Sequence, residues 1–141
     1  MRMMAKINSR AKGKSAEREL IGELKRLLPG ALTDGLERNL TQTRNGGHDI
    51  LGLDGWAIEV KRYAEVKPAD MQRFWEQTTE QARKEQARPV LCYRQDRREW
   101  RAVVSASEVM PIDSVDYDHT IEMSLPLFAR MVKDRAHVQE S

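Results

Sequence analysis

The sequence lacks the features that mark several large classes of protein. A single cysteine, Cys92, excludes an internal disulfide framework and a cysteine-rich zinc site. No apolar run approaches the roughly 20 residues that cross a bilayer, and no hydrophobic signal segment follows the basic N-terminus. No repeat or Pro/Gly/Ser-rich linker divides the 141 residues, a length typical of one domain. We therefore expect a single cytoplasmic domain without a membrane partner.

The small net charge of +2 conceals a strong polarity along the chain. Residues 1–30 carry a charge of +5, whereas residues 102–141 carry −4. Basic clusters near the N-terminus and over residues 94–101 favour contacts with phosphate groups, although solvated surface explains them equally well. We predict a basic N-terminal arm over residues 1–14 and a single domain over residues 15–141.

The spacing of apolar residues predicts an α/β domain. A helix is expected from Ser15 to about Leu28, a loop over residues 31–37, and a long helix over residues 69–86 behind Pro68. Strand patterns occupy residues 40–44, 48–53, 56–62, 89–93 and 100–105, followed by a strand over 120–124 and a helix over 125–135. The order is α-β-β-β-α-β-β and then β-α. Because the long helix joins two strands, it implies a mixed central β-sheet flanked by helices.

An acidic residue falls where the first predicted helix should bury its apolar face. On a helical wheel with Ala16 at 0°, the apolar residues span about 140° and Glu17 lies at about 100°, inside that arc. A carboxylate that faces the core is costly unless it is paired or binds a cation. Alternatively, Glu17 lies early enough in the helix to complement the helix dipole and reach water. The sequence leaves both explanations open.

The strand over residues 56–62 presents two charges on one face. With a two-residue period, Glu59 and Lys61 share a face and flank the apolar Val60 of the other face. A solvated Glu–Lys pair would produce the same pattern. The preceding strand, however, begins near Asp49, which would bring a second carboxylate beside the first.

Two carboxylates beside an ammonium group suit a particular cation. Mg²⁺ prefers one or two carboxylates and keeps several waters for substrate phosphate, and the backbone carbonyl of Val60 could supply a further ligand. A water activated by the metal could then attack phosphorus while the metal and Lys61 stabilise the developing charge. Asp49, Glu59 and Lys61 are therefore candidate catalytic residues.

The two carboxylates meet only if the turn between their strands has the right length. Asp54-Gly55 is a strong hairpin signal, but a strict two-residue turn would pair Ile50 with Glu59 and place Asp49 on the opposite face. A three-residue loop or a β-bulge would place Asp49 and Glu59 on the same face of the sheet. We predict this one-residue offset, with the carboxylates no more than roughly 8 Å apart.

Three motifs follow one another along the chain: Gly13-Lys14-Ser15-Ala16-Glu17-Arg18-Glu19-Leu20, His48-Asp49-Ile50 and Ile58-Glu59-Val60-Lys61. Over about residues 12–128 the chain resembles the archaeal-type Holliday junction resolvases of the PD-(D/E)xK nuclease superfamily. The resemblance implies a restriction-endonuclease-like core and hydrolysis of DNA phosphodiesters that depends on Mg²⁺, for which Mn²⁺ may substitute. It also implies a homodimer with two symmetric sites acting on branched or four-way junction DNA.

The resemblance also implies roles for individual residues. Asp49, Glu59 and the Val60 carbonyl would bind metal, Glu17 would complete the ligand shell, and Lys61 would orient the nucleophile or stabilise charge. The residues expected to contact DNA are Lys12, Lys14, Arg18, Arg44 and Arg62. The sequence departs from the family where His48 replaces the usual proline and where only Thr41, Thr43 and Arg44 match the loop ahead of the Asp. The alternatives are a nuclease with another DNA substrate and a non-catalytic DNA-binding protein on this fold.

A few further residues carry weaker signals. Gln77 and Gln81, on the long predicted helix, resemble a glutamine found near some nuclease sites of this superfamily. Phe74 and Trp75 fit the buried stripe of that helix better than a role in base stacking. Cys92 lies in an apolar strand, which predicts an inert buried thiol.

Overall fold

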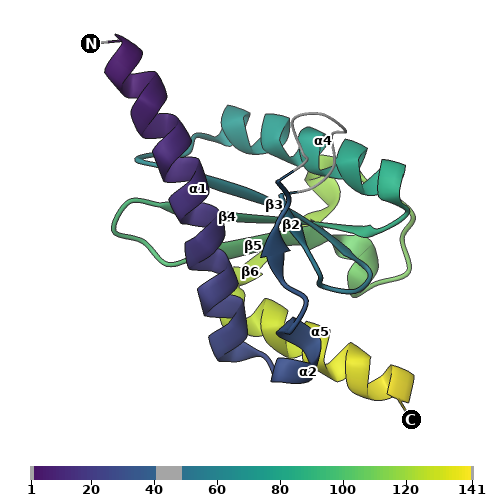
Figure 1. The fold of residues 1–141 in the computed structure, drawn as a ribbon. Helices are drawn as coiled ribbons and strands as arrows, with labels where there is room; N and C mark the ends of the chain where they lie inside the picture. Colours follow the sequence, from purple (N-terminus) through teal and green to yellow (C-terminus); the bar gives the residue numbers. More distant parts are fainter. Residues whose placement is uncertain (1, 41–48, 141) are drawn as a thin grey trace.

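The computed structural model describes residues 2–40 and 49–140, with side chains described for residues 13–40 and 49–136. A six-stranded sheet forms its centre, with strand order β1-β2-β3-β4-β5-β6 (Figure 1). β3 and β4 run parallel, and every other neighbouring pair of these strands is antiparallel. The predicted α/β fold with a mixed central sheet is therefore confirmed.

The elements follow one another in an order close to the predicted one. They are α1 (Arg2–Leu27), α2 (Gly30–Thr33), β1 (Glu37–Arg38), β2 (Ile50–Leu51), β3 (Trp56–Tyr63), α4 (Pro68–Glu85), β4 (Arg88–Gln95), β5 (Arg101–Ser105), the 3₁₀ turns η1 (Ala106–Glu108) and η2 (Tyr117–His119), β6 (Thr120–Ser124) and α5 (Leu125–Glu140). From β2 onward every predicted helix and strand is present, and α5 extends beyond its expected end. None of the helices in the described part of the chain is long and apolar enough to cross a membrane.

The N-terminal third departs from the prediction. α1 begins at Arg2 instead of Ser15, because residues 2–14 hold no proline and contain alanines, lysines and arginines that favour helix. The expected loop over residues 31–37 contains α2 and the start of β1. β1 pairs Arg38 with Ile50, so the first strand lies before the predicted 40–44 segment. Within that segment Leu40 is 77% exposed, and the rest lies outside the described residues.

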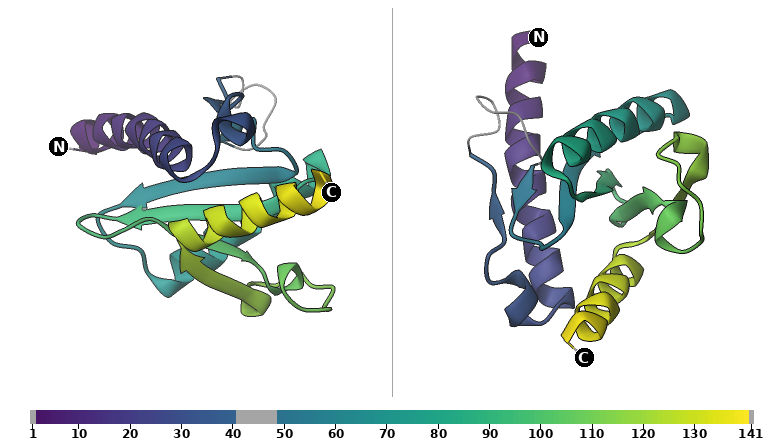
Figure 2. Two further views of the ribbon diagram at one scale, coloured as in Figure 1. Left: turned by 90° about the horizontal axis from the view of Figure 1, so that it is seen from below. Right: turned by 90° about the vertical axis from the view of Figure 1, so that its right-hand side faces the viewer.

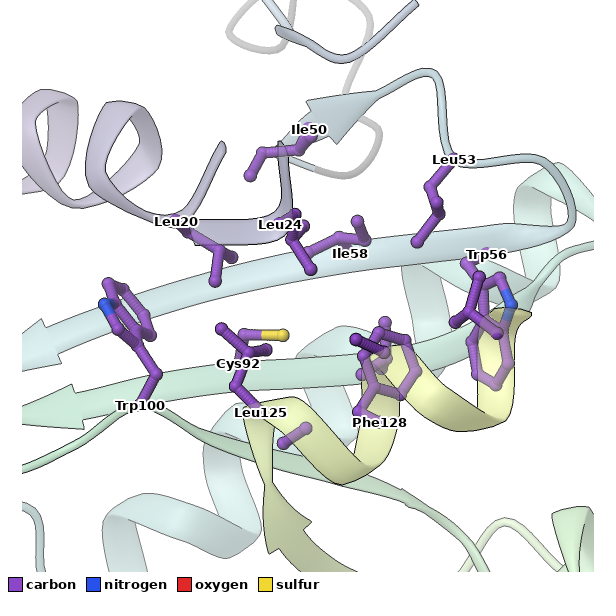
Figure 3. Packing of buried hydrophobic residues seen from close by; sticks show 14 of the residues in the cluster. Leu20, Leu24, Ile50, Leu53, Trp56, Ile58, Cys92, Trp100, Leu125 and Phe128 are labelled. Atoms are coloured by element: carbon purple, nitrogen blue, oxygen red, sulfur yellow. The ribbon is translucent and has the colours of Figure 1, made fainter. Parts of the chain in front are cut away.

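Two groups of helices cover the two faces of the sheet (Figure 2). α1 and α5 pack on one face, where Leu20, Leu24 and Phe128 contact Ile58 and Cys92 (Figure 3). α4 covers the other face with the predicted stripe, which comprises Met71, Phe74, Trp75, Thr78 and Ala82. Burial raises the pKa of the Cys92 thiol to about 12, which confirms the prediction of an inert buried cysteine.

The β2–β3 hairpin has the predicted offset. Ile50 pairs with Ile58, whereas a strict two-residue turn would pair it with Glu59. The loop is therefore one residue longer, and Gly55 supplies the positive φ of +81° that such a loop requires. As a result Asp49 lies opposite Glu59, on the same face of the sheet.

Two glycines next to this hairpin make different demands on the backbone. We expect Gly52→Ala to lower the free energy of unfolding by about 3–5 kcal/mol, because a Cβ on this residue would overlap the Gly35 carbonyl and its φ is +100°. Gly55→Ala should cost only about 1–2 kcal/mol, since its φ is positive but no atom lies within 4 Å of a new Cβ. Urea denaturation of both variants measures the difference. Equal losses would show that the close approach of Gly52 to Gly35 contributes nothing.

Candidate active site

A cavity of about 330 Å³ lies where α1, β3 and α4 meet. All four predicted catalytic residues contribute to its wall. The lining residues are Gly13, Glu17, Asp49, Glu59, Val60, Lys61, Arg62, Tyr63, Ala64 and Gln77. The fold thus brings together acidic side chains from an α-helix, a hairpin and a central strand.

A larger cavity of about 670 Å³ lies between η1, β6 and α5. Its walls are mainly apolar, and its two acidic groups already pair with arginines: Glu108 with Arg135, and Asp134 with Arg130. Because it offers no unpaired acid, base or nucleophile, it is a poorer candidate for an active site.

The β2–β3 hairpin and the backbone of β3 position the two central carboxylates. Asp49 is 6% exposed and Glu59 2% exposed. The Val60 N–H donates a hydrogen bond of 2.7 Å to Oδ2 of Asp49, which orients that carboxylate toward β3. On the next inward-facing position of the same strand, Nζ of Lys61 lies 3.7 Å from Oε1 of Glu59.

The environment of Glu59 disfavours its negative charge. Burial, which is the largest cause, and the neighbouring Asp49 together raise its pKa to about 8, although Lys61 offsets part of the effect. Oε2 of Glu59 is buried and accepts no hydrogen bond from the described residues. A buried carboxylate oxygen without a donor, beside a second carboxylate, is a favourable place for a cation.

The donor set matches a hard divalent cation with an incomplete protein shell. Among the described residues, no group of three or more His, Cys, Asp or Glu side chains is arranged to hold a metal ion by itself. Asp49 and Glu59 supply two carboxylates, which is the number that Mg²⁺ usually takes from protein when waters and substrate phosphate complete its octahedron. The residues present therefore fit Mg²⁺.

Phe74 of α4 helps to hold Lys61 in place. The Lys61 ammonium lies 5.1 Å from the centre of the Phe74 ring, and the ring of Tyr63 stacks on the same residue at 5.4 Å. Phe74 is buried, as predicted, yet one of its contacts is with the candidate catalytic lysine. The apolar cluster beneath α4 thus contacts the candidate active site through Phe74.

Glu17 reaches the cavity but already has a partner. Nε of Arg38 in β1 donates a hydrogen bond of 2.6 Å to its Oε2. Burial raises the pKa of Glu17 and the charge of Asp49 raises it further, while Arg38 lowers it. The helical wheel correctly marked Glu17 as a carboxylate turned toward the core. It gave no sign of Arg38, because the first strand was expected further along the chain.

Glu19, two residues further along α1, also binds residues from several elements. Its carboxylate accepts hydrogen bonds from Arg62 at 3.3 Å and from the Trp100 indole at 2.9 Å, and it forms an ion pair with Arg94. We call these four residues the Glu19 cluster. Arg62 also lies 3.9 Å from Asp96, so its guanidinium is engaged within the protein. The prediction that Arg62 contacts DNA stays a prediction.

The remaining predicted residues are distributed around the cavity or lie outside the description. Lys14 and Arg18 are exposed on α1, each next in sequence to a residue that lines the cavity. Gln77 lines the cavity, whereas Gln81 does not. The predicted residues that lie outside the described side chains are Lys12, Thr41, Thr43, Arg44 and His48.

Comparison with known proteins points to one family. A family model described as "Phage putative PDDEXK endonuclease" matches residues 8–125, a range that includes every acidic residue of the cavity. Among solved structures, the chain is similar to Hjc from Archaeoglobus fulgidus, a Holliday junction resolvase from an archaeal hyperthermophile. The TM-score is 0.45 and the identity 21%, over 83% of this chain and 87% of that chain. No curated protein matches the sequence.

The raised pKa of Glu59 predicts that the metal-free protein loses stability as pH rises. The native state binds the Glu59 proton more tightly than the unfolded state, so the stabilisation is present at about pH 4.5 and is lost progressively as pH rises through about 8. We expect a loss of a few kcal/mol in wild type with EDTA, and a clearly smaller loss in Glu59→Gln. Urea denaturation at several pH values measures both.

The exposed Glu76 of α4 provides the matched control, since Glu76→Gln removes the same charge from a solvated position. That variant should retain the pH dependence of wild type. An identical pH dependence in Glu59→Gln and wild type would contradict the assignment.

Proposed function

This chain belongs to the phage PDDEXK endonuclease family, and from that membership and the site geometry we propose that it is a divalent-metal-dependent endodeoxyribonuclease, with four-way junctions as its preferred substrate. The single observation that carries the proposal is the juxtaposition of two buried carboxylates and one ammonium group. Asp49 and Glu59 lie opposite each other, and Lys61 lies 3.7 Å from Glu59. A protein that only binds DNA has no need for this costly arrangement.

The carboxylates of Asp49 and Glu59 and the backbone carbonyl of Val60 would hold the metal. The carboxylate of Glu17, which pairs with Arg38 in the metal-free protein, would complete the ligand shell. Mg²⁺ is the expected ion and Mn²⁺ the expected substitute. When bound, a divalent cation neutralises the developing charge on phosphate and favours deprotonation of a water nucleophile.

The protein residues then have distinct tasks in hydrolysis. A water oxygen bonds to phosphorus, one P–O ester bond breaks, and the leaving oxygen takes a proton, which yields one phosphomonoester end and one hydroxyl end. Lys61, held by Glu59 and Phe74, donates a hydrogen bond to the nucleophile or to a phosphate oxygen and offsets negative charge. The Val60 N–H fixes Asp49 for the same reaction.

The substrate is proposed on separate grounds. The motifs around Glu17, Asp49 and Glu59 resemble those of junction resolvases, which favours a homodimer whose two sites cut a four-way junction symmetrically. The exposed Lys14 and Arg18 support DNA binding, because they carry positive charge to the rim of the cavity. Lys12, Arg44 and Arg62 are the further proposed contacts. A PD-(D/E)xK nuclease with another DNA substrate would keep the same catalytic residues.

Removing the catalytic groups should abolish cleavage without abolishing binding. We expect Lys61→Ala, Asp49→Asn and Glu59→Gln each to lower the cleavage rate by at least about a hundredfold, because each removes a group that acts in the transition state. EDTA should eliminate cleavage by wild type. Single-turnover cleavage of labelled DNA gives the rate, and fluorescence anisotropy gives the affinity.

Lys84→Ala is the control for the loss of a lysine, since Lys84 is exposed near the end of α4 and pairs only weakly with Glu80, at 4.0 Å. Its activity should equal that of wild type. Cleavage that persists in both Asp49→Asn and Glu59→Gln would exclude this site.

A substrate panel separates the two nuclease proposals. With Mg²⁺, we expect cleavage of a four-way junction at paired positions and at least about tenfold slower cleavage of linear duplex and single-stranded DNA. Equal rates on junction and duplex would retain the nuclease but exclude junction preference. Sedimentation of the protein at micromolar concentration, with and without junction DNA, tests the proposed dimer.

A further inference from the structure

The turn between β4 and β5 carries an arginine where the backbone favours glycine or asparagine. The Arg98 N–H donates a hydrogen bond of 3.1 Å to the Gln95 carbonyl, which closes the turn. Arg97 occupies its third position with a φ of +64°, in the left-handed region. This conformation is unfavourable for a long side chain, so the fold alone does not explain an arginine at this position. We refer to residues 95–98 as the arginine turn.

Of the four arginines over residues 94–101, two form ion pairs with acidic side chains and two do not. Arg94 pairs with Glu19 and donates a hydrogen bond of 2.7 Å to the Arg98 carbonyl, while Arg101 pairs with Glu122. The side chains of Arg97 and Arg98 are exposed, and neither forms an ion pair with any side chain in the described part of the molecule. Asp96 lies against Arg62, and the exposed Glu99 lines a shallow cavity together with Arg98 without forming an ion pair with it.

The arginine turn is fixed beside the candidate active site. The Asp96 N–H donates a hydrogen bond of 3.1 Å to the carbonyl of Tyr63, which lines the cavity. The Glu19 cluster joins Arg94 of β4 and Trp100, which directly precedes β5, to α1 at a position two residues beyond Glu17. In Figure 1 the β4–β5 and β3–α4 connections extend past the same side of α1. The backbone that carries Arg97 and Arg98 is therefore anchored to the wall of the cavity.

We propose that Arg97 and Arg98 bind the phosphate backbone of the DNA substrate outside the catalytic cavity. The inference rests on the proposed nuclease function and adds a binding surface to it. Guanidinium groups on a rigid turn suit phosphate oxygens, and such contacts position a duplex without reading its bases. A DNA strand cut in the cavity would thereby be held at a second point, beside the C-terminal end of β3.

The test removes both charges without disturbing the turn. Arg97→Asn suits the left-handed backbone, and Arg98→Gln keeps a polar side chain of similar length. With Ca²⁺ replacing Mg²⁺ to suppress cleavage, we expect the double variant to raise the Kd for a labelled four-way junction at least about tenfold near 100 mM salt. The slope of log Kd against log salt should fall by about 1.8, the value for two phosphate contacts.

The matched control removes two arginines elsewhere. Arg83→Gln/Arg130→Gln carries the same charge change, but Arg83 lies near the C-terminus of α4 and Arg130 on α5, each paired with an acid of its own helix. We expect its salt slope to equal that of wild type. Arg98→Gln alone, which leaves the left-handed position untouched, should reduce the slope by about half as much as the double variant.

Three results would overturn the inference. They are an unchanged Kd and salt slope in the Arg97→Asn/Arg98→Gln variant, an equal loss of affinity in the control, and a loss of affinity accompanied by a lower melting temperature. Cleavage by wild type reports separately on the proposed function. If wild type cuts DNA but the double variant binds normally, only the role of Arg97 and Arg98 in DNA binding is excluded. If wild type neither binds nor cuts DNA, both the nuclease proposal and this inference fail.

Discussion

The repulsion between two buried carboxylates, those of Asp49 and Glu59, is the constraint around which the site is built. Neither side chain is more than 6% exposed, so water cannot screen the pair. Among the described residues, the Val60 N–H donates a hydrogen bond to Asp49, and an ammonium group lies 3.7 Å from Glu59. Burial first, and the nearby Asp49 second, raise the pKa of Glu59 in spite of Lys61. Below about pH 8 the metal-free site therefore keeps a proton on Glu59, and a bound cation would favour the loss of that proton.

The stability that maintains this unfavourable pair comes from the opposite face of the same hairpin. Ile50 and Ile58 pair across β2 and β3 and are completely buried against α1. Because side chains alternate along a strand, the register that buries these two isoleucines also places Asp49 opposite Glu59. A slip of one residue would lose apolar burial at the same time as it separated the acids. The core thus fixes the position of the chemistry.

Sequence reasoning succeeded where the signal was local. The period of α4, the Pro68 start and the Asp54-Gly55 turn each fit within one or two elements. The turn located the hairpin, and the predicted one-residue offset then brought Asp49 beside Glu59. Sequence reasoning failed for partners that only the tertiary fold brings close. The contacts of Arg38 with Glu17 and of Trp100 with Glu19 span 21 and 81 residues, and no local pattern marks them. β1 was not predicted because Glu37 and Arg38 alone form it, which is too short a segment to show alternation. Of the predicted strand over residues 40–44, only the exposed Leu40 lies in the described part of the chain.

The Glu19 cluster also has a consequence for how this protein can change over evolutionary time. One carboxylate serves two guanidinium groups and an indole from three strands or their connections, so a substitution at any of these positions alters the environment of all the others. Contacts shared in this way make the effects of single substitutions non-additive, and tolerated changes then depend on what already occupies the neighbouring positions. At the tip of the same hairpin, the exposed side chains of Arg97 and Arg98 take no part in the cluster, although Asp96 lies 3.9 Å from Arg62. Sequence drift can therefore remodel the tip while the frame beneath it stays constant.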